Sequence, residues 1–201
     1  MNRARPLVDW LLTSLPLLAA LAATVTLIGT EAEVVSFFST FRADHPEMTQ
    51  FMNFVTDFGN PFFYVVFLAM LIVAWRRGDA RTKRFFFVYI IVQLLIALIT
   101  VRFLKMTIGR PRPGEGMFFD PLTSSGANHS LPSGHTTEIT GAAGALALFC
   151  GRHWLSLALG VGIALVGFSR IYLGMHHPSD VFFGWLLGSV SIVAIYTFSR
   201  K

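Results

Sequence analysis

The chain has 201 residues, of which 54% are apolar and only 13% are charged, and its mean hydropathy is +0.61. Soluble domains carry about 25% charged residues, so this composition excludes an ordinary soluble domain and indicates that lipid surrounds most of the chain. The net charge of +5 does not indicate a nucleic-acid partner, because the basic residues lie at the ends of apolar runs.

Apolar runs that are suited to a bilayer recur along the chain. They cover residues 7–29, 61–75, 85–104, 131–150, 154–172 and 181–198. The pattern predicts an all-α, polytopic membrane protein with six transmembrane helices, in one integral membrane domain over residues 1–201. Arg3 and Arg5 before the first run resemble the start of a signal peptide. We expect an uncleaved helix, however, because the run continues past its small-residue Ala20-Leu21-Ala22 site.

The segment between the first two runs, residues 30–60, is polar and mixed. It contains "VVSFFSTFR" and "MTQFMNFVTDFG", both with aromatic residues at helical spacing. We predict short interfacial helices here, although ordinary amphipathic packing would give the same pattern. The run 61–75 is short for a membrane span, so the second span is expected to begin inside the preceding segment.

The loop charges predict the orientation of the chain. Five basic residues and one acidic residue lie in 76–84, and further basic residues flank both ends of the chain, whereas segment 30–60 carries five acidic residues and Arg42 alone. Both termini are therefore expected in the cytoplasm. The exceptions to this rule lie on the opposite face: Lys105, Arg110, Arg112 and Arg170.

These exceptions come together with two histidine-containing motifs. Lys105 ends the third run, His135 opens the fourth, and Arg170 ends the fifth, so alternating topology brings them to one membrane face. Clustered cations repel one another unless an anion neutralises them, and Arg and Lys suit phosphate oxygens. The sequence therefore predicts an anion site at the outer face.

The motif "PSGH" lies at the start of the fourth run. Gly134 permits close approach of a ligand to the backbone, and Ser133 is placed to cap the helix that follows. The free N–H groups of a helix N-terminus favour an anion. We predict a phosphate cradle here, with His135 beside it as a proton-transfer group.

The motif "HHPSD" lies before the sixth run. Asp180 follows His176 by four residues, and a carboxylate that accepts from one imidazole nitrogen leaves the other nitrogen free to attack phosphorus. These residues alone do not decide between His176 and His177 as the nucleophile.

Three segments together resemble the signature motifs of the type 2 phosphatidic acid phosphatase superfamily, also called lipid phosphate phosphatases. They are Lys105 with Arg112-Pro113, then Pro132-Ser133-Gly134-His135, then Ser169-Arg170 with His176 and Asp180. The order and spacing match over 105–180, and the six-run pattern extends the resemblance over the whole chain.

The resemblance implies a role for each matching residue. His176 would form a phosphohistidine, Asp180 would orient it, and His135 would protonate the leaving group. The phosphate oxygens would be held by Lys105, Arg112, Ser133, Gly134 and Arg170. The family needs no metal or other cofactor, and its site faces outward.

Outside the motifs, Arg110 is a candidate for contact with a headgroup or second phosphate. Glu138 is a candidate for orienting His135, shaping headgroup choice or pairing with a cation.

We therefore expect metal-independent hydrolysis of a lipid phosphate, or of the terminal phosphate of a diphosphate, at the outer face of a bacterial inner membrane. The substrates that the resemblance implies are phosphatidylglycerol phosphate, phosphatidic acid, undecaprenyl diphosphate and a lipid A phosphate. A lipid-to-lipid phosphotransferase would use the same first step. A metal-dependent hydrolase is disfavoured by the clustered cations. A transporter is disfavoured because the polar residues gather at one face instead of along a path.

Overall fold

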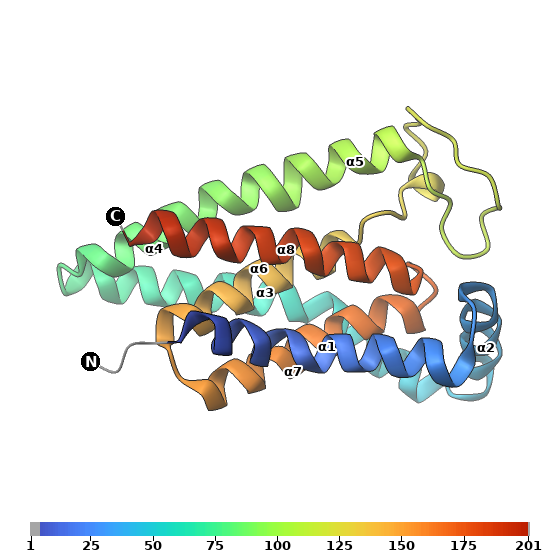
Figure 1. Cartoon of the computed structure of the whole chain (residues 1–201), viewed down its shortest axis with the longest axis horizontal. Helices are drawn as coiled ribbons and strands as arrows, with labels where there is room; N and C mark the ends of the chain where they lie inside the picture. Colours follow the sequence, from blue (N-terminus) through green and yellow to red (C-terminus); the bar gives the residue numbers. More distant parts are fainter. Residues whose placement is uncertain (1–4, 201) are drawn as a thin grey trace.

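The computed structural model describes residues 5–200, and this part of the chain is helical and contains no strand. The helices are α1 (Pro6–Ile28), α2 (Glu31–Asp44), α3 (Pro46–Arg76), α4 (Ala80–Gln93), α5 (Val101–Ile108), α6 (Gly134–Cys150), α7 (His153–Tyr172) and α8 (Pro178–Ser199). A π-helical segment, η1 (Leu94–Thr100), joins α4 to α5, and a 3₁₀ turn, η2 (Gly126–Asn128), precedes α6. Most helices follow the long axis of the molecule, whereas α2 lies at one end (Figure 1). The predicted all-α class is confirmed.

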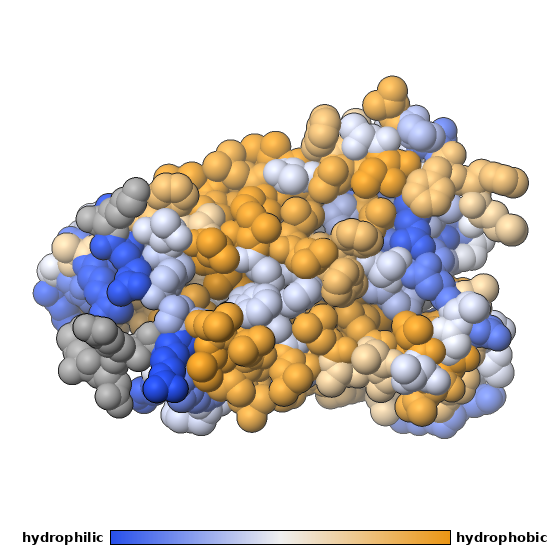
Figure 2. Space-filling view, viewed as in Figure 1, coloured by the Kyte–Doolittle hydropathy of each residue, from blue (hydrophilic) through white to orange (hydrophobic). Residues whose placement is uncertain are grey.

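Five helical segments are long and apolar enough to cross a membrane. They are Pro6–Ile28, Pro46–Arg76, Ala80–Ile108, His153–Tyr172 and Pro178–Ser199. Many of their large apolar side chains are exposed, and Figure 2 shows apolar surface over the middle of the molecule with polar surface toward its ends. This arrangement is that of an integral membrane protein, because a soluble protein would not leave such a surface in water.

Helix α6 differs from these five because it is shorter and much more buried. It has 17 residues and packs against α1, α3, α7 and α8. The segment Thr136–Leu148 is buried apart from Glu138. A helix of 17 residues is at the lower limit for a membrane span. Helix α6 therefore lies at the centre of the bundle, in contact with most of the membrane-spanning helices.

The region after α1 differs in part from the prediction. Helix α2 is a separate short helix, which begins at a capping box between Thr30 and Glu33 after Gly29 breaks α1 with a positive φ of 117°. The second expected interfacial helix, over "MTQFMNFVTDFG", is instead the first half of α3. Helix α3 continues through Pro61, since a membrane helix tolerates the backbone hydrogen bond that proline removes when neighbouring groups compensate.

The elements alternate between the two ends of the bundle (Figure 1). Helix α1 begins, and α8 ends, at the same end as the short connections after α3 and α6. The opposite end holds α2, the long loop 109–133 and the turn 173–177. Arg3 and Lys201, which contribute to the charge asymmetry, lie outside the described residues.

Close packing between α6 and α8 depends on two glycines of α8. A Cβ atom on Gly184 would lie 2.6 Å from the carbonyl oxygen of Ser133, and one on Gly188 would lie 2.4 Å from Cβ of Thr140. Their spacing of four residues is typical of membrane helices whose backbones approach closely. Since Ser133 and Asp180 lie at the adjoining ends of these helices, this contact fixes the distance between the second and third motifs.

We expect Gly188→Ala to destabilise the protein, because the added methyl group would meet Thr140 and the carbonyl of Thr137 at 2.8 Å. Overpacking of this kind costs about 1–3 kcal/mol in the free energy of unfolding. The matched control is Gly162→Ala in α7, where an added Cβ would meet nothing within 4 Å. Thermal unfolding in detergent measures both variants, and equal midpoints would contradict the packing argument.

Candidate active site

Residues of all three motifs meet at the end of the bundle that holds α2. Lys105 lies in the last turn of α5, His135 in the first turn of α6, and Arg170 in the last turn of α7. Lys105 interacts electrostatically with Arg112, Arg170 and Asp180, and His135 interacts with Lys105, Arg112 and Arg170. The structure thus brings together side chains that lie up to 75 residues apart in sequence.

His176 and Asp180 form a buried pair. The His176 side chain is 2% exposed and that of Asp180 is fully buried, and Nδ1 of His176 lies 3.7 Å from Oδ2 of Asp180. That separation is longer than a hydrogen bond. Asp180 Oδ2 also accepts hydrogen bonds from Ser130 Oγ (2.6 Å) and from the backbone N–H of His177 (2.8 Å). Burial lowers the pKa of His176 to about 4, so its imidazole is neutral at pH 7.

The turn between α7 and α8 fixes the position of His176. The backbone N–H groups of Met175 and His176 donate to the carbonyl oxygen of Arg170 at 3.0 and 3.1 Å. Because Nδ1 of His176 faces Asp180, its Nε2 is the nitrogen left for chemistry. His177 instead occupies the N-cap position of α8.

Three cations beside this pair have unused donors. Within residues 5–200, no carboxylate lies within ion-pair distance of Lys105, Arg112 or Arg170. Arg170 is 7% exposed, and it donates from Nη1 to Thr56 Oγ1 at 2.7 Å while its buried Nε has no partner. Arg112 donates from Nε to the carbonyl of Gly126 at 3.1 Å. A set of cations without carboxylate partners suits an anion with several oxygens.

Ser133 lies in the predicted N-cap position of α6, but the predicted cap bond from its side chain is wrong. Its hydroxyl accepts from Thr136 Oγ1 at 2.9 Å, and its N–H donates to the Asp180 carbonyl at 2.9 Å. A Cβ on Gly134 would make only an ordinary contact, 3.6 Å from Val101. Packing alone therefore does not require glycine at 134, and close approach of a ligand stays a prediction.

Arg110 has contacts unlike those of the other three cations. Its guanidinium forms ion pairs of 2.6 Å with both Glu31 and Asp180, and it also donates to Ser179 Oγ at 2.7 Å. Its side chain is 14% exposed. The contact of Arg110 with a headgroup or second phosphate stays a prediction.

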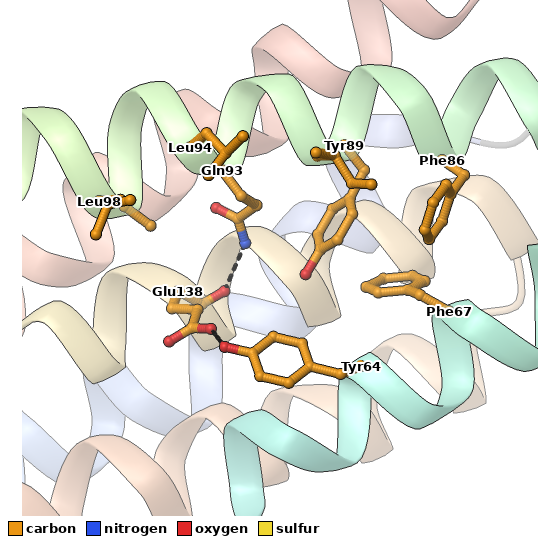
Figure 3. A pocket seen from close by; sticks show the side chains of 10 residues that line it. Tyr64, Phe67, Phe86, Tyr89, Gln93, Leu94, Leu98 and Glu138 are labelled. Carbon is orange, nitrogen blue, oxygen red and sulfur yellow. Dashed lines mark hydrogen bonds between the residues drawn. The ribbon is translucent and has the colours of Figure 1, made fainter.

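Glu138 faces a pocket on the side of the bundle, between α3 and the α4–η1 segment (Figure 3). Its carboxylate accepts hydrogen bonds from Asn60 Nδ2 (2.8 Å) and from the Tyr64 hydroxyl, and its carbonyl accepts from Gln93 Nε2 (2.9 Å). In the described part of the chain, Glu138 has no ion pair with a cation. The pocket has a volume of about 440 Å³ and is lined by Tyr64, Phe67, Phe86, Tyr89, Ile90, Gln93, Leu94, Ala97, Leu98 and Glu138.

Several residues that contact the motifs or Glu138 were missed by the sequence analysis. Thr56 binds Arg170, Ser130 binds Asp180, and Asn60 donates both to Glu138 and to the carbonyl of His135. Thr56 and Asn60 are polar residues four apart on the buried face of α3. This spacing indicates a buried helix face, but the prediction of a separate interfacial helix over 48–59 concealed it.

Comparisons with known proteins agree with this geometry. A model of the PAP2 superfamily matches residues 86–201. The chain is 27% identical over 187 residues to an undecaprenyl-diphosphatase of Sulfolobus acidocaldarius, covering 90% of this chain and 85% of that protein. It is 32% identical to a lipid A 1-phosphatase of Rhizobium johnstonii, covering 56% of this chain and about half (48%) of that protein.

The fold also matches a solved structure. The crystal structure of a transmembrane PAP2-type phosphatidylglycerolphosphate phosphatase from Bacillus subtilis superposes with a TM-score of 0.64, at 24% identity. The match covers 98% of this chain and 96% of that one. The resemblance seen in the motifs is confirmed, and the chain belongs to the PAP2 superfamily.

Proposed function

We propose that the protein is a lipid phosphate phosphatase that acts without a metal, through a phosphohistidine intermediate on His176. The observation that carries this proposal is the meeting of Lys105, Arg112 and Arg170, which have no carboxylate partner within residues 5–200, beside the buried His176–Asp180 pair. The activities named for the relatives, on undecaprenyl diphosphate, lipid A and phosphatidylglycerol phosphate, support a lipid phosphate as the substrate.

The reaction has two displacements at phosphorus. Nε2 of His176 attacks phosphorus, the bond to the leaving oxygen breaks, and His135 donates a proton to that oxygen. His135 then takes a proton from water, whose oxygen attacks phosphorus and releases His176 and inorganic phosphate. Lys105, Arg112, Arg170 and the N-terminus of α6, with Ser133 and Gly134, stabilise the charge on the phosphoryl oxygens.

The alternation of the helices between the two ends of the bundle also supports a proposed orientation of the chain in the membrane. In the proposed topology the chain has six spans with α6 as the central one, both termini are in the cytoplasm, and the active site is on the periplasmic or exterior face of a bacterial inner membrane. The basic connection 76–84 then lies inside, and the acidic segment 30–60 lies outside, in agreement with the charge rule.

The side pocket offers a place for part of the lipid. It opens between membrane helices and is lined mainly by apolar side chains, and the π-helical segment η1 contributes Leu94, Ala97 and Leu98 to it. Segments of this type are frequent at functional sites. Glu138 and Tyr64 supply a hydrogen-bonded polar pair in this pocket, and Glu138 follows His135 by three residues on α6, so this pair is a candidate for contact with the headgroup.

The proposed activity is tested by phosphate release from purified protein in detergent. The panel contains phosphatidylglycerol phosphate, phosphatidic acid, undecaprenyl diphosphate and lipid A, each with and without a chelator. Release that resists the chelator supports the proposal, and the relative rates rank the substrates. Release that stops with the chelator would contradict it. Phosphate that appears on an added acceptor lipid instead of in water would favour the phosphotransferase.

Glu138→Gln is expected to raise KM for the lipid several-fold and to leave hydrolysis of water-soluble p-nitrophenyl phosphate nearly unchanged. The amide would present an NH₂ group to the Tyr64 hydroxyl or to the Asn60 amide, which would weaken one of the two hydrogen bonds that hold the side chain at 138 in its place in the pocket. The control is Glu47→Gln, at an exposed position of the first turn of α3. Equal losses on both substrates would contradict a role in lipid binding.

A further inference from the structure

A carboxylate outside the three motifs is connected to the proposed catalytic pair. Glu31, the first residue of α2, accepts at Oε1 from the backbone N–H (3.0 Å) and the hydroxyl (2.6 Å) of Ser179. Its Oε2 accepts from Nη2 of Arg110 at 2.6 Å. Both partners directly adjoin Asp180, one in sequence and the other by an ion pair.

Arg110 connects the two carboxylates. One of its terminal nitrogens donates to Glu31, and the other donates to Asp180 Oδ1 at 2.6 Å and to Ser179 Oγ at 2.7 Å. The Arg110 side chain is 14% exposed and that of Asp180 is fully buried. Charge-assisted hydrogen bonds of this length in a buried setting fix the positions of both groups.

The negative charge of Glu31 also changes how strongly Arg110 acts on Asp180. Burial alone would raise the pKa of Glu31, but its hydrogen bonds from Ser179 and the charge of Arg110 outweigh burial and hold the pKa below its usual value. Glu31 is therefore ionised at pH 7 and shares the positive charge of Arg110 with Asp180. Without Glu31, Arg110 would neutralise Asp180 more fully and weaken its hold on the imidazole of His176.

We infer that Glu31 is a positioning residue, which acts through Arg110 and Ser179 to hold Asp180 in place and to preserve its charge toward His176. This inference rests on the proposed function. It makes α2, which lies outside the membrane-spanning bundle and outside the three motifs, a part of the catalytic apparatus. It also explains why Arg110 has carboxylate partners, whereas the other three cations at the site have none among the described residues.

The test is a double-mutant cycle on Glu31 and Arg110, with steady-state kinetics on the panel lipid that the wild type hydrolyses fastest. Glu31→Gln is expected to lower kcat about tenfold and to change KM less than about twofold, because Glu31 does not touch the substrate. Glu31→Gln with Arg110→Gln is expected to be no less active than Arg110→Gln alone. The matched control, Glu33→Gln, lies on the same helix, and within the described chain its side chain hydrogen-bonds only with Thr30, so it is expected to behave as wild type.

Thermal unfolding of each variant separates positioning from stability. The inference is overturned if Glu31→Gln behaves as Glu33→Gln does, or if its loss of activity follows the loss of folded protein. It is also overturned if the effects of Glu31→Gln and Arg110→Gln on kcat add independently, or if Glu31→Gln changes KM instead of kcat. A wild type that releases no phosphate, or a His176→Ala variant that still does, overturns the proposed function and this inference together. Normal release that His176→Ala abolishes and Glu31→Gln leaves unchanged overturns the inference alone.

Discussion

Replacing His176 by alanine is expected to lower phosphate release by about 10⁴-fold or more, the scale of loss when a covalent nucleophile is removed. The proposed intermediate forms on Nε2 of this imidazole, and no other nitrogen nucleophile is paired with Asp180 among the described side chains. Burial keeps the pKa of His176 at about 4, so the wild-type imidazole is neutral and nucleophilic at pH 7. Brief incubation with lipid labelled at the phosphate, followed by an alkaline quench, measures the phosphohistidine directly.

His177→Ala is the matched control for this variant. It removes an adjacent imidazole, whereas its backbone N–H, which donates to Asp180 Oδ2 at 2.8 Å, remains. We expect His177→Ala to keep most of the activity and the labelled intermediate. If His177→Ala loses the intermediate and His176→Ala keeps it, the two histidines have been assigned the wrong way round.

Much of the fold follows from hydropathy alone. The first, fifth and sixth apolar runs agree with α1, α7 and α8 within about three residues at each end, as expected for boundaries read from sequence. Residues 46–76 were harder to predict as one helix, because Pro61 is a helix breaker in water and the polar residues before it favoured a separate interfacial helix. In the structure, Thr56 and Asn60 on that helix turn inward to bind Arg170 and Glu138, so tertiary contacts compensate for the local signals.

In the candidate site, the grouping of the motif residues was predictable from sequence, whereas the partners of these residues were not. Fixed spacing within the motifs, and the alternation of helices, place Lys105, His135, Arg170 and His176 at one end of the bundle. The partners of these residues were not predictable, because Glu31 and Thr56 are joined to the site only by the packing of α2 and α3. Glu31 is 149 residues from Asp180 in sequence, and from sequence it was read only as part of an acidic outer loop. Local patterns do not encode such contacts.

The π-helical segment η1 is a further feature that the sequence did not reveal. The run "LLIALIT" is apolar and has no glycine or proline, so its composition is that of an ordinary membrane helix. Three of its side chains line the pocket beside Glu138. The carboxylate at 138 was identified as a functional candidate from its position inside a membrane helix, and only the structure shows that it faces this pocket.

Asp180→Asn is expected to lower kcat by about 10³- to 10⁴-fold, the order found when the carboxylate of a histidine–carboxylate pair becomes an amide. An amide has one acceptor oxygen, whereas the wild-type carboxylate accepts at Oδ1 from Arg110 and at Oδ2 from Ser130 and His177. Either orientation of the amide therefore presents an N–H group to a donor. The imidazole of His176 also loses the charge that fixes its tautomer.

The same substitution is expected to destabilise the folded protein, because Asp180 is fully buried and each buried donor left without a partner costs about 1–3 kcal/mol. Ser130→Ala is the matched control, since it removes one hydrogen bond to Asp180 Oδ2 and leaves the carboxylate. It is expected to lower the unfolding midpoint with only a modest loss of kcat. Kinetics and thermal unfolding on the two variants separate these effects. If Asp180→Asn retains wild-type kcat, then Asp180 serves only the structure, and His176 is oriented by the turn between α7 and α8 instead.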